Sequence, residues 1–303
     1  MSEARTTRCG YVALVGAPNA GKSTLLNALV GAKVSIVSPK VQTTRRRVLG
    51  IAIHEGAQII FVDTPGIFAP RPGRRLERAM VSAAWAGAQD ADLVVLLVDV
   101  TKPDDPDTAA IVERLRATGY KAVLALNKID LVKPPVLLGI ADRFATHRLF
   151  EPIFMVSGLS GDGVADLERH LAEALPEGPW LYPEDQLSDL PERLMAAEVT
   201  REQIFLQLRN ELPYASTVET DKWEERNDGS ARIEQTIFVQ RPSQKAIMLG
   251  ESGQRIKHIG ERARAELETL LGRRVHLFLH VRVEKDWTED RERYEAIGLD
   301  FES

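Results

Sequence analysis

The sequence has little cysteine, few aromatic residues and no long apolar run. Its 303 residues include one cysteine, and aromatic residues make up 6% of the chain. One cysteine excludes a disulfide framework and a cysteine-based zinc site, and it favours a reducing compartment. The most continuous apolar segment, residues 93–98, is far too short to cross a bilayer. Residues 1–10 lack the apolar stretch of a secretory signal, so we expect a cytoplasmic chain.

Hydrophobic residues (44%) and charged residues (27%) are present in amounts that suit two packed domains. Short apolar runs alternate with helical patterns up to about residue 175, which predicts a mostly parallel six-stranded sheet with helices on both faces. The turn at 54–56 predicts a hairpin that makes one edge strand antiparallel. Three prolines and a glycine within 175–183 mark a domain boundary. We therefore predict a first domain over 1–176, a linker over 177–190 and a second domain over 191–303.

A glycine loop directly follows the predicted strand 11–15 and precedes a helical pattern. Its spacing, Gly, four residues, then Gly-Lys-Ser, directs backbone N–H groups at phosphate, as in a P-loop. The Lys22 ammonium reaches the terminal phosphates, and the Ser23 hydroxyl binds Mg²⁺. The residues assigned to nucleotide binding here are Gly16, Ala17, Pro18, Asn19, Ala20, Gly21, Lys22, Ser23 and Thr24.

The base is read about a hundred residues later, after the predicted strand 122–126. Asp130 can accept two hydrogen bonds from the ring N–H and the exocyclic amine of guanine. Asn127 and the stem of Lys128 are expected to pack against the base and against the glycine loop. Adenine offers neither donor in that place, so GTP and GDP are the expected ligands. A further loop, Ser157, Gly158 and Leu159, is assigned to the guanine carbonyl.

The motif Asp63-Thr64-Pro65-Gly66 lies between the glycine loop and the motif at 127–130, and it follows a third apolar strand. Asp63 is predicted to hold Mg²⁺ through water, together with Ser23. The Gly66 amide is predicted to sense the γ-phosphate, so that the following loop changes shape on hydrolysis. In the polar stretch after the first helix, we assign Thr44, rather than Thr43, as the switch I threonine that closes on the metal. The predicted catalytic set is thus Lys22, Thr44, Gly66 and Asn19.

Ile67 stands where many small GTPases have a glutamine that orients the attacking water. Its side chain cannot position water, which predicts slow intrinsic hydrolysis. Asn19 is a candidate for holding K⁺ beside the β- and γ-phosphates, which would supply the missing positive charge. The alternative is that Asn19 only shapes the loop, and the sequence leaves both open.

The second domain has the order helix (191–210), strand (216–223), strand (231–239), helix (243–249), a GxxG loop, a longer helix and a strand (275–283). This order is typical of a type II KH domain, an α+β fold whose GxxG loop admits the backbone of single-stranded RNA. From residue 181 on, acidic residues outnumber basic ones, so we expect a narrow basic strip on an acidic domain. The predicted RNA contacts are Lys245, Ile247, Gly250, Glu251, Ser252, Gly253, Arg255, Ile256 and Lys257.

Taken together, these motifs resemble the Era family of ribosome-assembly GTPases over nearly the whole chain. The resemblance depends on residues 16–24, 42–45, 63–66, 127–130, 211–214 and 247–260. It implies a monomeric GTPase that binds the 3′ end of 16S ribosomal RNA through its KH domain and assists assembly of the small ribosomal subunit. It also implies peripheral contact with the inner membrane in some bacteria. The acidic Glu251 and the following Ser252 depart from the family pattern, and so does Gly158.

Two alternatives belong to other classes. A GTPase subunit of a tRNA-modification system shares the motifs before residue 160, but the lack of a C-terminal cysteine and the KH-like order argue against it. A membrane-linked GTPase adaptor would use its last helix, around 289–297, to bind lipid or protein. Residues 288–294 are too acidic for a basic amphipathic anchor.

Overall fold

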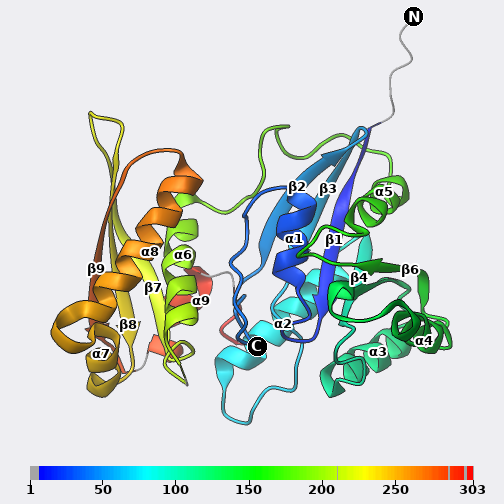
Figure 1. Cartoon of the computed structure of the whole chain (residues 1–303), viewed down its shortest axis with the longest axis horizontal. Coiled ribbons are helices and arrows are strands. Elements are labelled where there is room, and N and C mark those ends of the chain that lie inside the picture. Colours follow the sequence, from blue (N-terminus) through cyan, green and yellow to red (C-terminus); the bar gives the residue numbers. More distant parts are fainter. Residues whose placement is uncertain (1–6, 210, 286, 297–298, 303) are drawn as a thin grey trace, which may run out of the picture. The chain divides into compact units, whose positions relative to one another are not determined.

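The computed structural model describes residues 7–209, 211–285, 287–296 and 299–302 (Figure 1). The chain forms two compact units. Unit 1 consists of residues 1–35, 44–189 and 295–303, and unit 2 consists of residues 36–43 and 190–294. Two segments therefore pack with the unit to which the sequence did not assign them: 36–43 lies with the second unit, and the described residues from 295 on lie with the first.

The described part of unit 1 contains one sheet of six strands in the order β2-β3-β1-β4-β5-β6. Strand β2 runs antiparallel to β3, and the other neighbours are parallel, which confirms the predicted sheet and hairpin. The elements of this unit are β1 (Arg8–Gly16), α1 (Lys22–Val30), β2 (Val48–His54), β3 (Ala57–Asp63), α2 (Arg75–Gln89), β4 (Leu93–Asp99), α3 (Pro106–Thr118), β5 (Ala122–Asn127), η1 (Ile129–Leu131), α4 (Pro134–Ala145), β6 (Phe150–Val156) and α5 (Val164–Ala174).

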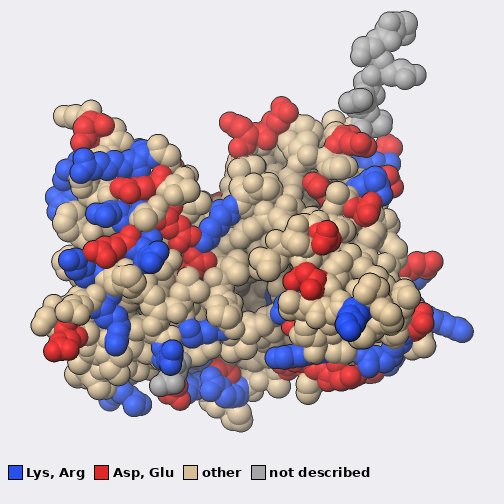
Figure 2. Space-filling view, in the orientation of Figure 1, with Lys and Arg blue, Asp and Glu red and all other residues tan. Residues whose placement is uncertain are grey.

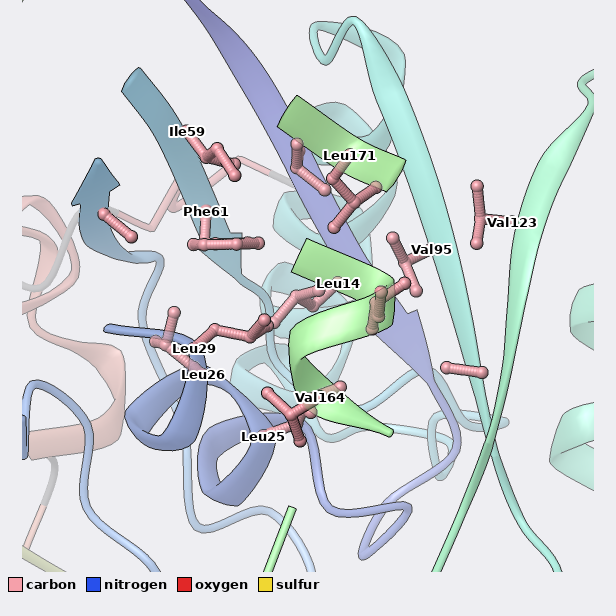
Figure 3. Close-up of a cluster of buried hydrophobic side chains, with 14 of the residues drawn as sticks. Leu14, Leu25, Leu26, Leu29, Ile59, Phe61, Val95, Val123, Val164 and Leu171 are labelled. Carbon is pink, nitrogen blue, oxygen red and sulfur yellow. The ribbon is translucent and has the colours of Figure 1, made fainter. Parts of the chain in front are cut away.

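Helices cover both faces of this sheet, so its strands are apolar almost throughout. On one face, side chains from α1 and α5 pack on β1, β3 and β4, as Leu25, Leu171 and Phe61 illustrate (Figure 3). The other face is covered by α2, α3 and α4. Because β1, β3, β5 and β6 point the same way, their carboxyl ends meet at one rim. Every predicted nucleotide motif begins at that rim.

The predicted linker is ordered along the β2 edge of the sheet. The Ile51 amide donates to the Leu187 carbonyl at 2.9 Å, so the linker covers an edge strand that would otherwise be open. The fully buried Gln58 side chain accepts from the amides of Leu181 (2.8 Å) and Tyr182 (3.0 Å) and donates to the Tyr182 carbonyl (2.8 Å). The segment 177–189 is therefore part of unit 1.

Unit 2 has the predicted KH order. Its three described strands form a sheet in the order β7-β8-β9, antiparallel between β7 and β8 and parallel between β8 and β9. Helices α6 and α8 pack on one face over two apolar clusters. The predicted end of the first helix, Asn210, lies outside the described residues. The elements are α6 (Glu192–Gln207), β7 (Ser216–Glu225), β8 (Ala231–Val239), α7 (Pro242–Leu249), η2 (Glu251–Gly253), α8 (Gln254–Leu271), β9 (Val275–Val283), η3 (Trp287–Glu289) and α9 (Arg291–Ala296).

Candidate functional site

The glycine loop joins β1 to α1, and Lys22 folds back over it. Its Nζ donates to the carbonyl oxygens of Gly16 and Ala17, both at 3.0 Å. Burial lowers the pKa of Lys22 to about 8, although the charge of Asp63 opposes this shift. Gly21, the N-cap of α1, has a φ of 95°, and no side chain caps the helix there. The open N-terminus of α1 and the buried ammonium together favour a chain of phosphates.

Asp63 lies within hydrogen-bonding distance of three hydroxyl groups. Its Oδ2 accepts from Ser23 Oγ at 2.8 Å and from Ser35 Oγ at 2.9 Å, with Thr44 Oγ1 at 3.5 Å. Burial raises the pKa of Asp63, while the charge of Lys22 and these hydroxyl donors act to lower it. The other oxygen, Oδ1, is buried without a hydrogen-bond partner. A free carboxylate oxygen beside hydroxyl groups is the kind of donor set that Mg²⁺ prefers.

The structure places the two switch threonines differently. Thr44 Oγ1 lies 2.9 Å from Ser23 Oγ, in the cluster around Asp63. Thr43 Oγ1 instead contacts its own loop, through Ser38 Oγ at 2.6 Å and the Lys40 carbonyl at 2.8 Å. The geometry therefore supports Thr44, rather than Thr43, as the residue able to reach a metal at this site.

The segment after β3 lies directly against the glycine loop. The Ile67 amide donates to the Gly16 carbonyl at 3.1 Å, and a Cβ on Gly66 would lie only 2.9 Å from Pro18 Cα. The Ile67 side chain is buried in the apolar cluster under α2. Its role is therefore packing, and it directs no polar group toward the phosphate site.

The guanine motif is built onto the glycine loop by side-chain bonds. Asn127 Nδ2 donates to the Ala20 carbonyl at 2.8 Å, and its Oδ1 accepts from the Gly158 amide at 3.1 Å. Lys128 Nζ donates to the Asn19 carbonyl at 2.7 Å. These bonds hold two loops, far apart in sequence, around one space.

Ser157 orients the carboxylate of Asp130, which the sequence assigns to the base. Its Oγ donates to Asp130 Oδ1 at 2.7 Å, which fixes the direction of the side chain. Leu159, in contrast, is 82% exposed. The sequence did not identify Asp99 or Ser35 as parts of the site. Asp99 Oδ2 pairs with Lys128 Nζ at 2.5 Å and thus holds the lysine stem, while Ser35 completes the Asp63 cluster.

The GxxG loop joins α7 to α8 through a single 3₁₀ turn. Gly250 has a φ of 73°, and a Cβ there would lie 2.7 Å from Arg255 Cβ. Arg255 Nη1 donates to the Ile247 carbonyl at 2.7 Å, so this side chain braces the loop. Glu251 and Ser252 are exposed at the tip. Such a loop lets a nucleic-acid backbone approach closely.

The residues flanking this loop differ in exposure. Ile247 is half exposed and Lys257 is exposed, whereas Ile256 packs against the apolar cluster under α6. Ile256 thus contributes mainly to the fold. Lys and Arg side chains alternate with Asp and Glu over the face of this unit that Figure 2 shows. On this face the basic side chains are interspersed with acidic ones and form no broad basic field (Figure 2).

Comparison with known proteins assigns both units to classes. The family model described as 50S ribosome-binding GTPase matches residues 11–128, and the model described as KH domain matches residues 211–288. The chain is therefore a GTPase that carries a KH domain.

The family follows from full-length relatives, and the chain belongs to the GTPase Era family. GTPase Era of Brucella suis is 56% identical over 300 residues, covering 99% of this chain and 96% of that protein. GTPase Era of Rhizobium meliloti is 58% identical over 295 residues, covering 97% of this chain and 94% of that protein. A crystal structure of Era with MgGDPNP and nucleotides 1506–1542 of 16S ribosomal RNA matches with a TM-score of 0.91 at 40% identity, covering 96% of this chain and 99% of that one. A crystal structure of an Aquifex aeolicus Era variant bound to GDP and AlF₄⁻ matches with the same TM-score, identity and coverage.

Proposed function

We propose that this chain is a GTP-hydrolysing switch that binds the 3′ end of 16S ribosomal RNA and assists assembly of the small ribosomal subunit. The observation that carries the proposal is the likeness over almost the whole chain to the Era structure solved with MgGDPNP and that RNA segment. The glycine loop, the motif at 127–130 and the GxxG loop are all present in this chain, and side-chain bonds hold the first two together. Maturation of the ribosomal RNA end is part of the same proposed role.

The nucleotide site acts mainly by positioning and charge. Ser23, Thr44 and Asp63 would hold Mg²⁺, with Asp63 acting through water. A metal held by these residues would neutralise negative charge on the terminal phosphates. The Lys22 ammonium binds the terminal phosphates and the Gly66 amide faces the γ-phosphate. Ile67 supplies no group that orients water, so intrinsic hydrolysis is expected to be slow.

Asn19 is proposed to hold K⁺ beside the β- and γ-phosphates. It has a positive φ of 63° and its carbonyl accepts from Lys128, so it lies in the turn that faces the phosphates. GTP hydrolysis should be faster in KCl than in NaCl at equal ionic strength, and Asn19→Ala should remove the difference. Equal rates of the wild-type protein in the two salts would contradict a role for K⁺.

Binding at the GxxG loop can be tested by placing one charge there. A Cβ on Gly253 meets no atom within 4 Å, and Asp and Asn tolerate its φ of 77° better than other residues. Gly253→Asp should weaken binding of a single-stranded 16S 3′-end oligonucleotide about tenfold or more, because the carboxylate would face phosphates. Gly253→Asn is the matched uncharged control. Fluorescence anisotropy measures both, and equal affinities of the two variants would refute RNA binding at this loop.

The location and assembly state proposed for the chain come from its sequence and from the family resemblance. Among the described residues, no helix has the length and apolarity that a membrane span requires. We propose a cytoplasmic monomer with peripheral contact to the inner membrane. Sedimentation of the purified protein and its flotation with anionic vesicles test the two parts separately.

A further inference from the structure

Residues 36–43 belong to the polar stretch after α1 that leads to the predicted switch I threonine, Thr44, and they pack with unit 2. Their two neighbours stay in unit 1, where Ser35 and Thr44 donate to Asp63. The loop is therefore anchored at both ends in the nucleotide site, while its middle belongs to the RNA-binding unit.

Helix α6 holds this loop through three bonds. Glu202 Oε1 accepts from the Val37 amide at 2.7 Å. Arg201 Nη2 donates to the Thr43 carbonyl at 2.6 Å, and Lys40 Nζ donates to the Phe205 carbonyl. The first bond lies near the start of the segment 36–43 and the second at its last residue, so α6 holds this segment between the two residues that contact Asp63.

The two charged residues of α6 are deeply buried for their type, with Arg201 2% and Glu202 3% exposed. Glu198 compensates the charge of Arg201 by accepting from Nε at 2.9 Å and from Nη2, and the guanidinium stacks over the Phe205 ring. Nη1 is buried without a hydrogen-bond partner. A buried, incompletely satisfied arginine stabilises a fold poorly compared with an apolar side chain, which points to a role beyond packing.

We infer that Glu202 and Arg201 of the RNA-binding unit are positioning residues for GTP hydrolysis. The Thr43 carbonyl that Arg201 contacts belongs to the same planar peptide as the Thr44 amide. Fixing that carbonyl fixes the orientation of the chain as it enters Thr44, whose hydroxyl lies at Ser23 and Asp63. The inference rests on the proposed function, since it concerns the same switch.

The test compares Glu202→Ala with Glu202→Gln in the full-length chain. The alanine removes the acceptor for the Val37 amide, whereas the glutamine retains an oxygen in the same place. We expect Glu202→Ala to lower kcat for GTP about tenfold, to weaken binding of a GTP analogue more than binding of GDP, and to change GDP affinity less than twofold. Glu202→Gln should recover most of the loss. Leu206→Ala, on the exposed side of the same helix, is the control.

A second variant separates the loss of the contact between the loop and α6 from a general loss of fold. Lys40→Ala removes a contact that the loop itself makes, and it should lower kcat about threefold without changing GDP affinity. The inference fails if both variants keep wild-type kcat, or if GDP affinity falls as much as GTP-analogue affinity. If the wild-type protein does not hydrolyse GTP, the proposed function fails instead, so the two failures are distinguishable.

Discussion

At the scale of single residues, we predict that base selection depends on Asp130. Its carboxylate, held by Ser157, accepts where guanine donates, and an amide in its place would present an N–H to those donors. We predict that Asp130→Asn weakens GDP binding about 100-fold, since two hydrogen bonds to a charged acceptor are lost. Xanthosine diphosphate, which carries a carbonyl in place of the exocyclic amine, should bind the variant better than GDP does. Titration with both diphosphates measures the exchange.

The wild-type protein is the control for this reversal, because it should prefer GDP to xanthosine diphosphate by a similar factor. A variant that still bound GDP about as tightly as wild type would show that Asp130 does not read the base. Far-UV circular dichroism of the variant separates a loss of contact from a loss of fold.

The sequence predicted the residues of this site whose spacing within one motif is diagnostic, such as Lys22, Asp63 and Asp130. It did not predict Asp99 or Ser35. Asp99 matters only because β4 lies beside β5, which brings its carboxylate to Lys128. Ser35 matters because the loop after α1 turns back to Asp63. Neither has a local pattern that a single sequence can reveal.

At the scale of elements, the segment 177–189 owes its order to Gln58. This buried side chain satisfies two amides and one carbonyl of the segment. Gln58→Leu would leave these backbone groups without partners, so we predict a loss of about 2–4 kcal/mol in the free energy of unfolding. Faster cleavage of the segment by a protease should accompany it. Urea denaturation and limited proteolysis measure the two effects.

Leu187→Ala, at an exposed position of the same segment, is the control, because it leaves the backbone bond between Leu187 and Ile51 in place. It should cost clearly less than Gln58→Leu, and equal losses would contradict this account. The prolines of the segment predicted a boundary within 175–183, whereas the chain passes from unit 1 to unit 2 between residues 189 and 190. They did not predict that the segment would lie along β2, because that contact requires partners more than 120 residues away.

The C-terminal segment is a second element that the sequence assigned to the other unit, since its described residues from 295 on pack with unit 1. Leu299 is buried, and the Arg75 guanidinium at the start of α2 lies 4.2 Å from the centre of the Phe301 ring. We predict that Phe301→Ala lowers the free energy of unfolding by about 1 kcal/mol through the lost cation–π contact and packing. Phe301→Tyr, which keeps the ring, should cost little. Urea titration distinguishes them, and identical losses would exclude the ring contact as the cause.

At the scale of the whole molecule, the sequence predicted two domains in series, whereas the chain exchanges segments between its two units. Residues 36–43 and 295–303 have no composition that marks them as belonging elsewhere. Their placement depends on bonds such as Val37 to Glu202, which join positions 165 apart in the sequence. Each unit therefore contains a piece of chain that continues directly into the other.

This exchange predicts coupling between the two ligands. Because switch I is continuous with both units, a nucleotide that fixes Thr44 should also change the free energy of RNA binding. We expect the affinity for the 16S 3′-end oligonucleotide to differ between a non-hydrolysable GTP analogue and GDP by about 5- to 150-fold, and linkage requires RNA to change the ratio of the two nucleotide affinities by the same factor. Anisotropy measures the first ratio and calorimetric titration the second. Glu202→Ala removes one bond between the segment 36–43 and α6, so it should reduce the RNA-affinity ratio and the nucleotide-affinity ratio by the same factor. If the wild-type protein binds the RNA equally tightly with either nucleotide, the two units act independently.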